Sequence, residues 1–486
     1  MMRANSCKPS RKRSRSHRKE PRGRTANRYR AYPTDEQFTL IKRFGGSCRF
    51  VKNLGKEQRD LAWRHGHHSV SYTAQSKEIL ALRNDPEYGT WLREVPAQVL
   101  QQALSDLNRA YQSFFDGHAG YPQWSRYSGW YSFRDPQDVK LRVKSRRWAE
   151  VKIQGLGWMR IRYHRPMRGA GIKSATVVME PDGKVFVSVL TEFHCRRPTR
   201  PLVEDWNTAV GVDRGVKVVV AASDGLGNAD LIDREMWTPG ERERLKRLER
   251  EREHKKCSRE KANRAITRAN KERKEKGEVP LPKLEKSRNQ EDTERQIATM
   301  HARARRRRKD FTEQVSTTLA RDHRLSAFED LHIKSMTAST KGSVDAPGKN
   351  VRQKAGLDQA ILDKGWYALE HRTGEKQVRH GHLHVVVAAP GTSITCRRCA
   401  HVDKESRVSQ SMFVCTNCGY EAHADLNAAE VIRERGMKLA LAGGTPVAAH
   451  QGTNLGPTLV GAEPSELSGR GRGNEETGTS TLEGAA

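Results

Sequence analysis

Residues 396–429 read CRRCAHVDKESRVSQSMFVCTNCGYEAHADLNAA, and this stretch carries the strongest local signal of the chain. It begins with two C-x-x-C pairs, Cys396 with Cys399 and Cys415 with Cys418, which are separated by fifteen residues. Each pair can bind one side of a tetrahedral Zn²⁺ ion. Because four thiolates fill the coordination shell and leave no position for water, we expect one structural zinc ion rather than a catalytic one. Gly419 follows the second pair and suits the tight turn of such a site.

Three acidic residues suggest a second kind of site. Asp425 opens an expected helix over 424–436, Asp213 ends the apolar run AVGVD, and Glu329 ends the apolar run LSAFE. Carboxylates at strand ends and at a helix start can meet at one edge of a sheet, where hard oxygen ligands suit Mg²⁺ or Mn²⁺. A pair of such ions can activate a water molecule and stabilise the leaving oxygen in phosphodiester cleavage. Their separation along the chain does not establish that they meet, and each acid alone is compatible with a cap or a surface position.

Other polar and aromatic residues receive simpler interpretations. His423 and Asn427 flank Asp425, and each is expected either to support that carboxylate or to cap the helix. Three histidines alternate along an expected strand and are interpreted as polar-face residues rather than as a metal site: His380, His382 and His384. Three aromatic residues lie among basic ones, where they can stack on bases or pack in the core: Trp124, Trp130 and Tyr131.

The charge of the chain indicates a polyanionic partner. The 486 residues include 89 lysines and arginines against 58 acids, a net charge of +31, so nucleic acid is the expected partner. No apolar run is long enough for a transmembrane helix, and no apolar signal segment follows the basic start. Paired cysteines are typical of metal binding in a reducing compartment. We therefore expect a cytoplasmic protein, in the bacterial cytosol or nucleoid.

Three segments are expected to lie outside the hydrophobic cores. Residues 1–27 form a basic arm that is expected to be disordered, either contacting nucleic acid or simply solvated. Residues 241–310 hold 26 basic and 14 acidic residues, a net of +12, and are expected to form a charged helical arm that faces a polyanion. Residues 443–486 lack core-forming periodicity and are expected to be a disordered tail.

The N-terminal half alternates between strand and helix patterns. Residues 28–32 read as a short strand, after which Thr34 caps a helix with Gln37 as its capping-box partner. Apolar residues recur at helical spacing through 35–130, whereas residues 131–203 alternate with a period of two. This pattern predicts a β domain that is interrupted by a helical insertion and resumes after it.

Several of these motifs together resemble one known family. GVDRGVK around Asp213, FEDL around Glu329, the two C-x-x-C pairs and HADLNAA resemble the RuvC-like nuclease domain of the TnpB family. TnpB proteins are transposon-encoded RNA-guided nucleases, and the miniature type V CRISPR effectors look like their descendants. In the N-terminal half, AYPTDEQ, CRFVKNLG, EVPAQVLQQALSDLNRAYQSFF and GYPQW also look like segments of that family. The resemblance covers roughly residues 29–436.

The resemblance implies a multi-domain α/β and β fold. It combines an RNase H-like (RuvC) nuclease domain that contains an inserted zinc ribbon with an N-terminal β-barrel-like wedge domain that is interrupted by a helical recognition lobe. The expected parts are the basic arm at 1–27, the wedge domain at 28–34 and 131–203, the recognition lobe at 35–130, the nuclease domain at 204–390 and 424–442 with its charged helical arm at 241–310, the zinc-ribbon segment that binds target nucleic acid at 391–423, and the tail at 443–486.

The resemblance also implies roles for individual residues. Asp213, Glu329 and Asp425 match the family's catalytic carboxylates, which would bind Mg²⁺ or Mn²⁺, and the four cysteines match its zinc-binding segment. The implied partners are a guide RNA and a double-stranded target DNA, with a monomer or a dimer on one RNA. Arg214 departs from the family pattern, in which an aliphatic residue is common, but strand alternation predicts that its side chain points away from the site.

The expected function is RNA-guided cleavage of DNA, with a guide from a transposon end or a CRISPR array. One metal site would cut both strands in turn and leave 5′-phosphate and 3′-hydroxyl ends. Three alternatives act differently: a guide-directed repressor without cleavage, a transposase, and a junction resolvase. The repressor is disfavoured because all three carboxylates are present. The transposase is disfavoured because the sequence shows no site for strand transfer. The resolvase is disfavoured because it would not require the long N-terminal half.

Overall fold

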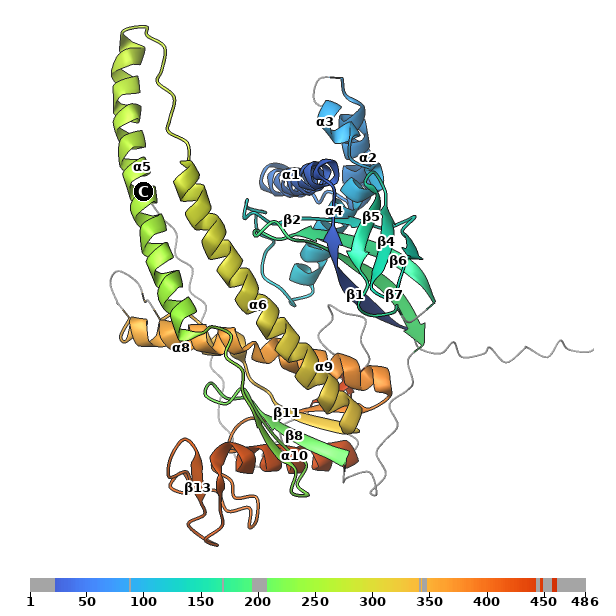
Figure 1. Ribbon diagram of the computed structural model, residues 1–486, viewed down its shortest axis with the longest axis vertical. Coiled ribbons are helices and arrows are strands. Elements are labelled where there is room, and N and C mark those ends of the chain that lie inside the picture. The colour runs from blue at the N-terminus through green and yellow to red at the C-terminus, as the bar shows by residue number, and fades with distance from the viewer. Residues whose placement is uncertain are drawn as a thin grey trace, which may run out of the picture.

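In the part of the chain that the structure describes, the strands form two seven-stranded sheets and one two-stranded ribbon (Figure 1). The computed structural model describes residues 22–86, 89–167, 170–194, 208–340, 342, 348–442, 446–448 and 457–460. Most of the expected basic arm and most of the expected tail therefore lie outside the described residues. No helix among the described residues is long and apolar enough to cross a membrane.

The N-terminal sheet is antiparallel, with strand order β2-β6-β7-β1-β5-β4-β3. Its strands are β1 (Arg22–Tyr32), β2 (Tyr131–Asp135), β3 (Lys140–Val143), β4 (Trp148–Ile153), β5 (Gly157–Arg162), β6 (Ala170–Met179) and β7 (Val185–His194). Because β2 and β3 are its two edges, hydrogen bonding leaves this sheet open, and the β-barrel-like wedge domain that the resemblance implies stays a prediction. β1 begins at Arg22, earlier than the expected boundary at residue 28, because it pairs with β7 from Arg22 opposite His194 to Ala31 opposite Val185.

Four helices lie between β1 and β2 in the chain: α1 (Asp35–Gly66), α2 (Tyr72–Asn84), α3 (Thr90–Arg93) and α4 (Ala97–Phe115). The predicted capping box is present at the start of α1, where the Thr34 hydroxyl accepts a bond from the Gln37 backbone and the Gln37 side chain accepts one from the Thr34 backbone. The Gln37 side-chain amide also donates to two backbone carbonyls of the sheet, those of Leu156 and Trp158.

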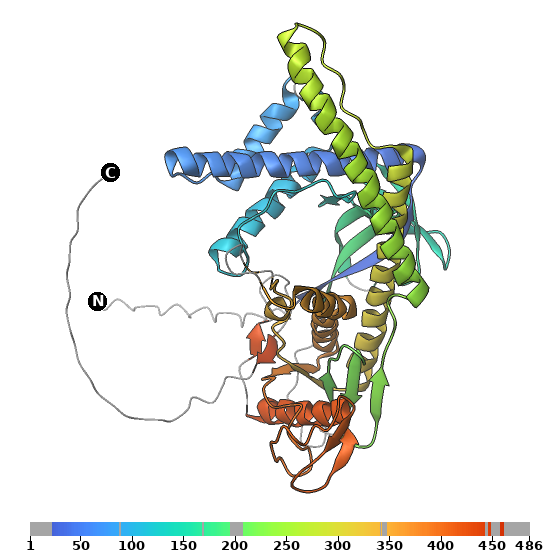
Figure 2. The same cartoon turned by 90° about the vertical axis from the view of Figure 1, so that its left-hand side faces the viewer.

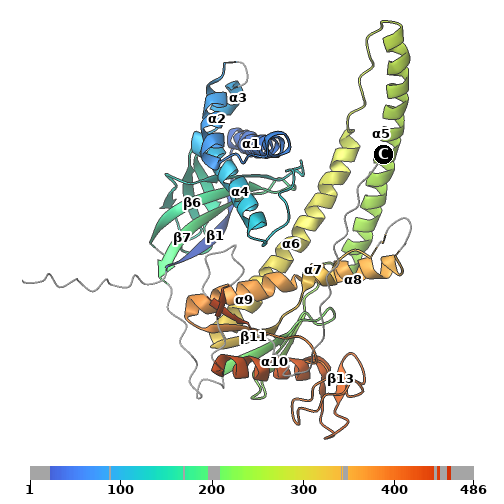
Figure 3. The same cartoon turned by 180° about the vertical axis from the view of Figure 1, so that it is seen from behind.

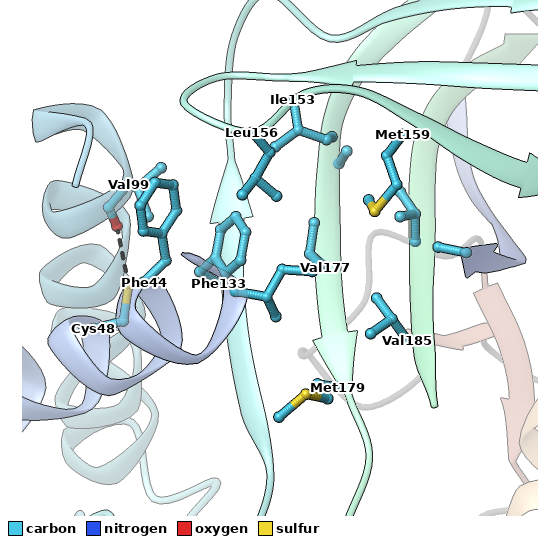
Figure 4. Close-up of a cluster of buried hydrophobic side chains, with 14 of the residues drawn as sticks. Phe44, Cys48, Val99, Phe133, Ile153, Leu156, Met159, Val177, Met179 and Val185 are labelled. Atoms are coloured by element: carbon cyan, nitrogen blue, oxygen red, sulfur yellow. Dashed lines mark hydrogen bonds between the residues drawn. The ribbon is translucent and has the colours of Figure 1, made fainter. Parts of the chain in front are cut away.

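These helices and the N-terminal sheet share one hydrophobic core (Figure 4). Phe44 and Cys48 of α1 and Val99 of α4 face Phe133 and Val177 of the sheet, and all five are buried. The Cys48 thiol lies 3.8 Å from the Val99 carbonyl oxygen. The helical insertion is therefore packed on the sheet as one body rather than attached to it by linkers.

The C-terminal sheet has strand order β10-β9-β8-β11-β12-β16-β15, in which β8, β11, β12 and β16 run parallel. Its strands are β8 (Ala209–Asp213), β9 (Val220–Ser223), β10 (Ala229–Ile232), β11 (Leu325–Glu329), β12 (Leu383–Val387), β15 (Pro446–Ala448) and β16 (Pro457–Val460). The tail that we expected to be disordered thus contributes two strands. β16 pairs with the edge of β12 through backbone groups, and such pairing does not require the apolar periodicity that the tail lacks.

Helices cover both faces of this sheet. On one face, α10 (Ala424–Leu441) packs so closely that a Cβ atom on Gly211 would lie 1.9 Å from the Ala429 carbonyl oxygen, and one on Gly436 would lie 2.4 Å from the Ala327 side chain. On the other face, α6 (Arg288–Asp322) and α9 (Trp366–His380) cover a second apolar cluster that includes Phe328. The parallel strands are therefore buried on both sides, as is typical of α/β domains.

A helical hairpin projects from the C-terminal sheet beside the N-terminal half (Figures 2 and 3). It consists of α5 (Pro239–Glu275) and α6, which is the charged helical arm expected at 241–310. Near its base, α6 contacts the turn between β6 and β7, where the buried Glu180 carboxylate pairs with Arg28, Arg305 and Arg306. The remaining elements are α7 (Ile333–Met336), α8 (Val351–Lys364) and a ribbon of β13 (Met412–Val414) with β14 (Glu421–His423).

Candidate active site and metal centre

The three acidic residues singled out in the sequence line one cavity. Asp213 is the last residue of β8 and Glu329 the last of β11, and these parallel strands pair with Val212 beside Phe328. Asp425 lies in the first turn of α10, which packs across both strands. The cavity has a volume of about 300 Å³. The topology therefore brings together three carboxylates that are far apart along the chain.

The carboxylates destabilise one another's charged forms. Burial, together with the nearby charges of Glu329 and Asp425, raises the pKa of Asp213 to about 7, against the opposing effect of the Arg214 backbone N–H, 2.8 Å from Asp213 Oδ1. Burial also raises the pKa of Glu329, against its hydrogen bond from the Thr392 hydroxyl. A bound cation would relieve this repulsion, so the donor set fits a divalent metal ion.

The carboxylate cavity and the cysteine cluster differ in the ions that they suit. Among the described residues, the four cysteines gather their ligand atoms closely around one position. Three carboxylates around one cavity can instead be shared by two divalent ions about 3.5–4 Å apart.

Arg214 follows Asp213, but its guanidinium group points away from the cavity. Its guanidinium is buried behind the strand, where Nη1 donates to Glu370 Oε2 at 2.6 Å and to the Trp366 carbonyl oxygen at 3.3 Å. The alternation of the strand predicts this orientation. Arg214 thus serves the cavity through its backbone N–H, while its side chain fixes the position of α9.

Arg407 also lines the cavity, and the sequence analysis missed it. It lies between the two cysteine pairs, and its Nη2 is 3.2 Å from Asp425 Oδ1 and 3.3 Å from the Gln410 carbonyl oxygen. The segment between the two cysteine pairs therefore contributes a cation to the carboxylate site. Its position in the sequence gives no signal for this role, because only the fold returns that loop to the start of α10.

The residues beside Asp425 have structural roles. The His423 side chain caps α10 by accepting a bond from the Asp425 backbone N–H at 3.3 Å. Asn427 is fully buried, donates to the Thr395 carbonyl oxygen at 2.8 Å, and accepts from the Arg397 backbone N–H at 3.0 Å. These bonds tie the start of α10 to the first cysteine turn.

The four cysteines form the cluster that their spacing predicts. Cys396 and Cys418 lie 3.7 Å apart, Cys399 and Cys415 lie 3.6 Å apart, and all four sulfurs are within 4.8 Å of one another. Backbone hydrogen bonding from His401 and a side-chain bond from Asn417 lower the pKa of Cys399 to about 6. Gly419 has the left-handed φ of 67° that the tight turn requires. The arrangement fits a tetrahedral ion with four thiolate ligands.

The histidines and aromatic residues differ among themselves. His384 is buried on β12, where its Nδ1 is 3.1 Å from the Ser326 hydroxyl and burial lowers its pKa to about 3. His380 ends α9 instead of lying on the strand. Trp124 and Trp130 are partly exposed and lie under Lys56 and Arg305, respectively, while Tyr131 packs against the N-terminal core.

Comparison with known proteins places this arrangement in a family. The family description "Cas12f1-like, TNB domain" matches residues 366–432, which span α9, the cysteine cluster and Asp425. Over 411 residues, the chain is 31% identical to a protein of Escherichia coli K12 that is named, provisionally, RNA-guided DNA endonuclease InsQ, covering 85% of this chain and 92% of the relative. The chain belongs to the TnpB family.

Other relatives are consistent with this TnpB assignment. A Streptomyces pristinaespiralis protein, also named provisionally as an RNA-guided DNA endonuclease, is 28% identical over 90% of this chain and 96% of its own length. The Cas12f1 endodeoxyribonuclease of Sulfoacidibacillus thermotolerans is 36% identical over 67 residues, 14% of this chain and 16% of its own length. A solved Cas12f1–sgRNA–target DNA complex aligns with a TM-score of 0.42 at 12% identity, covering 85% of this chain and 99% of the solved one.

A second family description, "Helix-turn-helix domain", matches residues 24–68. In this TnpB-family chain, the matched region is strand β1 followed by the single 32-residue helix α1. The helix continues without a turn to Gly66, so no recognition helix follows a turn there. The name of the matched domain thus does not describe the local structure.

Proposed function

We propose that this protein is an RNA-guided DNA endonuclease that hydrolyses DNA at the cavity formed by Asp213, Glu329 and Asp425. The observation that carries the proposal is the meeting of three carboxylates from β8, β11 and α10 in one cavity of about 300 Å³. Relatives that align over most of the chain are named RNA-guided DNA endonucleases. Such carboxylate groups bind the metal ions of many phosphodiester-cleaving enzymes.

The side chains around the cavity divide the work of hydrolysis. Asp213, Glu329 and Asp425 would hold Mg²⁺ or Mn²⁺, which, when bound, would lower the pKa of the attacking water and stabilise the leaving oxygen. The Thr392 hydroxyl orients the Glu329 carboxylate, and the Arg214 backbone N–H orients that of Asp213. Arg407 offers its guanidinium to the phosphate that enters beside Asp425. We expect 5′-phosphate and 3′-hydroxyl ends, with one site cutting both strands in turn.

The cysteine cluster supports that site from a distance. We propose that it holds one structural Zn²⁺ and thereby fixes the loop that presents Arg407. Asn427 connects the Cys396 turn to the helix that carries Asp425, so the two sites share a rigid element. The segment's expected contact with target nucleic acid stays part of the proposal.

Sequence choice would come from a guide RNA and not from the protein. Base-specific reading by proteins commonly uses a helix in the major groove, whereas basic side chains on phosphates give affinity without specificity. The single helix at 35–66 provides no recognition helix after a turn. Pairing between a bound RNA and one DNA strand would then select the target, with protein contacts reading a short flanking motif.

The deciding experiment exchanges the guide. Protein purified free of RNA is given plasmid DNA and Mg²⁺, alone, with the co-purifying RNA, and with that RNA carrying a replaced guide segment. Cleavage should require RNA, and its position should follow the replaced segment. Cleavage at one fixed site without RNA would contradict the proposal and favour a transposase or resolvase. Guided binding without cleavage would indicate a repressor.

A further inference from the structure

The distal part of helix α5 carries a continuous exposed basic face. Between residues 254 and 271 the helix has seven lysines and arginines and one acid, Glu260. Exposed residues follow one another at alternating steps of three and four, which places them along one side of the helix. They are Arg247, Arg250, His254, Cys257, Lys261, Arg264, Arg268 and Lys271, which we call the α5 stripe.

The cations of the α5 stripe make no salt bridges in the part of the chain that the structure describes, which holds for Arg247, Arg250, Lys261, Arg264, Arg268 and Lys271. Near the base, the hydrogen bond from Lys255 lowers the pKa of the Glu251 carboxyl, and the charge of Arg247 adds to this effect. Other cations of α5 have paired acidic partners: Lys255 lies 2.6 Å from Glu251, and Arg273 lies 3.0 Å from Glu278. The distal part of the stripe is therefore a row of cations without salt-bridge partners.

Another side of α5, next to the stripe, is already occupied by the chain itself. Two asparagines that lie two helical turns apart hold the segment returning from α5 to α6. Asn270 accepts from the Leu281 backbone N–H at 2.7 Å and donates to its carbonyl oxygen at 2.8 Å, and Asn263 makes the same pair of bonds to Leu284 at 2.7 and 3.1 Å. These four bonds fix the returning chain along the helix, about a third of a turn away from the stripe.

This support makes the arm a rigid extension of the nuclease half. Leu245 and Leu248 at its base are buried in the apolar cluster that also contains Phe328. At 1.5 Å per residue, Lys261 lies about 24 Å and Lys271 about 39 Å along the helix from Leu245. The distal part of α5 thus projects away from the sheet of β8 and β11 (Figures 1 and 2).

We propose that the α5 stripe binds the sugar-phosphate backbone of the structured part of the guide RNA. The proposal rests on the proposed function, which supplies two nucleic acids. Target DNA must reach the carboxylate cavity to be cut, whereas the RNA scaffold must be held without reference to its sequence and away from that cavity. A rigid row of lysines and arginines without aromatic or amide groups fits the second task, because contacts from such cations to phosphates give affinity and carry no sequence information.

The test neutralises the stripe and measures RNA affinity. The variant combines Lys261→Gln, Arg264→Gln, Arg268→Gln and Lys271→Gln, since glutamine keeps helix propensity. A matched control removes four exposed charges that each have an acidic neighbour: Arg109→Gln, Lys256→Gln, Arg295→Gln and Arg321→Gln. The probe is the RNA that co-purifies with the full-length wild-type protein, titrated at 50 to 200 mM salt.

The stripe variant should bind this RNA about 10- to 100-fold more weakly at 50 mM salt, and the slope of log Kd against log salt should fall by about 3, as the loss of four phosphate contacts requires. The control should stay within about threefold of wild type. At RNA concentrations that saturate the variant, target DNA binding and cleavage should also stay within about threefold. Thermal unfolding of both variants verifies that they are folded.

Two outcomes would overturn the proposal. Unchanged RNA affinity and salt slope would show that the stripe is only solvated. Normal RNA binding with weakened target DNA binding would assign the stripe to the DNA instead. If the wild-type protein fails to cut under RNA guidance, the proposed function fails, but the RNA titration still reports on the stripe.

Discussion

The cysteine cluster and the carboxylate cavity are two sites of opposite design. The four cysteines lie within residues 396–418, and their sulfurs converge within 4.8 Å because two short turns suffice to build the cluster. The carboxylates come from β8, β11 and α10, and they meet only because parallel strands end at the same edge of a sheet. A local site is built by its own segment, whereas a non-local site depends on the whole domain. Asn427 and Arg407 connect the two sites through hydrogen bonds, so a substitution that disrupts one site should also impair the other.

The largest effect should come from removing a carboxylate. Asp213→Asn keeps the shape of the side chain but loses a metal ligand, and metal-ion stabilisation is worth several kcal/mol. We expect Mg²⁺-dependent cleavage to fall by about 10³-fold or more, with guide RNA and target binding nearly unchanged. Rates with purified RNA–protein complex and binding by filter or gel assays check this. Near wild-type cleavage by Asp213→Asn would remove Asp213 from the site.

The next largest effect should come from the cysteine cluster. Purified protein should contain about one zinc per chain, and Cys396→Ser should lose it and unfold the local segment, because a structural metal supplies the folding energy there. Cleavage should fall by about 100-fold, since both Arg407 and the start of α10 lose their support. Elemental analysis and cleavage rates measure this, with Cys257→Ser, a cysteine outside the cluster, as the control for zinc content. Zinc retained in both Cys396→Ser and Cys415→Ser would contradict the assignment.

A smaller effect should come from the residue that joins the two sites. Arg407→Ala removes the cation beside Asp425 but leaves the zinc ligands in place, so zinc content should stay near one per chain. Cleavage should fall by roughly 10- to 100-fold, mainly in kcat. Arg398→Ala removes an exposed arginine of the same segment and should cut at the wild-type rate. Equal rates for both variants would show that Arg407 is only a surface contact.

The smallest effect should appear in the stability of the metal-free protein. In the unfolded chain Asp213 titrates near 3.8, whereas in the folded chain its pKa is about 7. Between these pH values the folded state holds a proton that the unfolded state has lost, so the free energy of unfolding falls as the pH rises. The loss of stability is complete above about pH 7. In EDTA, Asp213→Asn should therefore be more stable than wild type by about 2–4 kcal/mol at pH 8 and nearly equal at pH 4. Chemical unfolding at the two pH values measures it, and a difference that does not change with pH would contradict the cause.

The same contrast explains how much could be read from the sequence. The cysteine ligands and the capping box of Thr34 and Gln37 depend on spacings of a few residues, and both are present in the structure. The acids Asp213, Glu329 and Asp425 could be named, but their meeting could not be deduced from their spacing. The family resemblance suggested it, and family membership is confirmed by a relative that aligns over most of the chain. The catalytic role of the three acids stays a prediction.

Features that depend on partners distant in the chain were missed. β1 extends back to Arg22 because β7 is long enough to pair with it, and the sequence of 22–27 reads only as basic. The strand at 457–460 pairs with the edge of β12, and the strand at 446–448 pairs with that strand in turn, both through backbone groups, which leave no side-chain pattern. Arg407 enters the cavity through a loop whose path only the fold determines.

The close packing of α10 on β8 and β11 has a consequence for directed evolution. Gly211 and Gly436 have no room for a Cβ atom, with backbone or strand atoms 1.9 and 2.4 Å from its position. Rigid neighbours cannot yield as a flexible side chain can. A substitution at Gly211 would therefore push the helix that carries Asp425 away from the strand that carries Asp213, and one at Gly436 would push it away from the strand that carries Glu329. Libraries that seek more active variants should therefore hold both positions fixed and direct diversity to the exposed residues of the same helix.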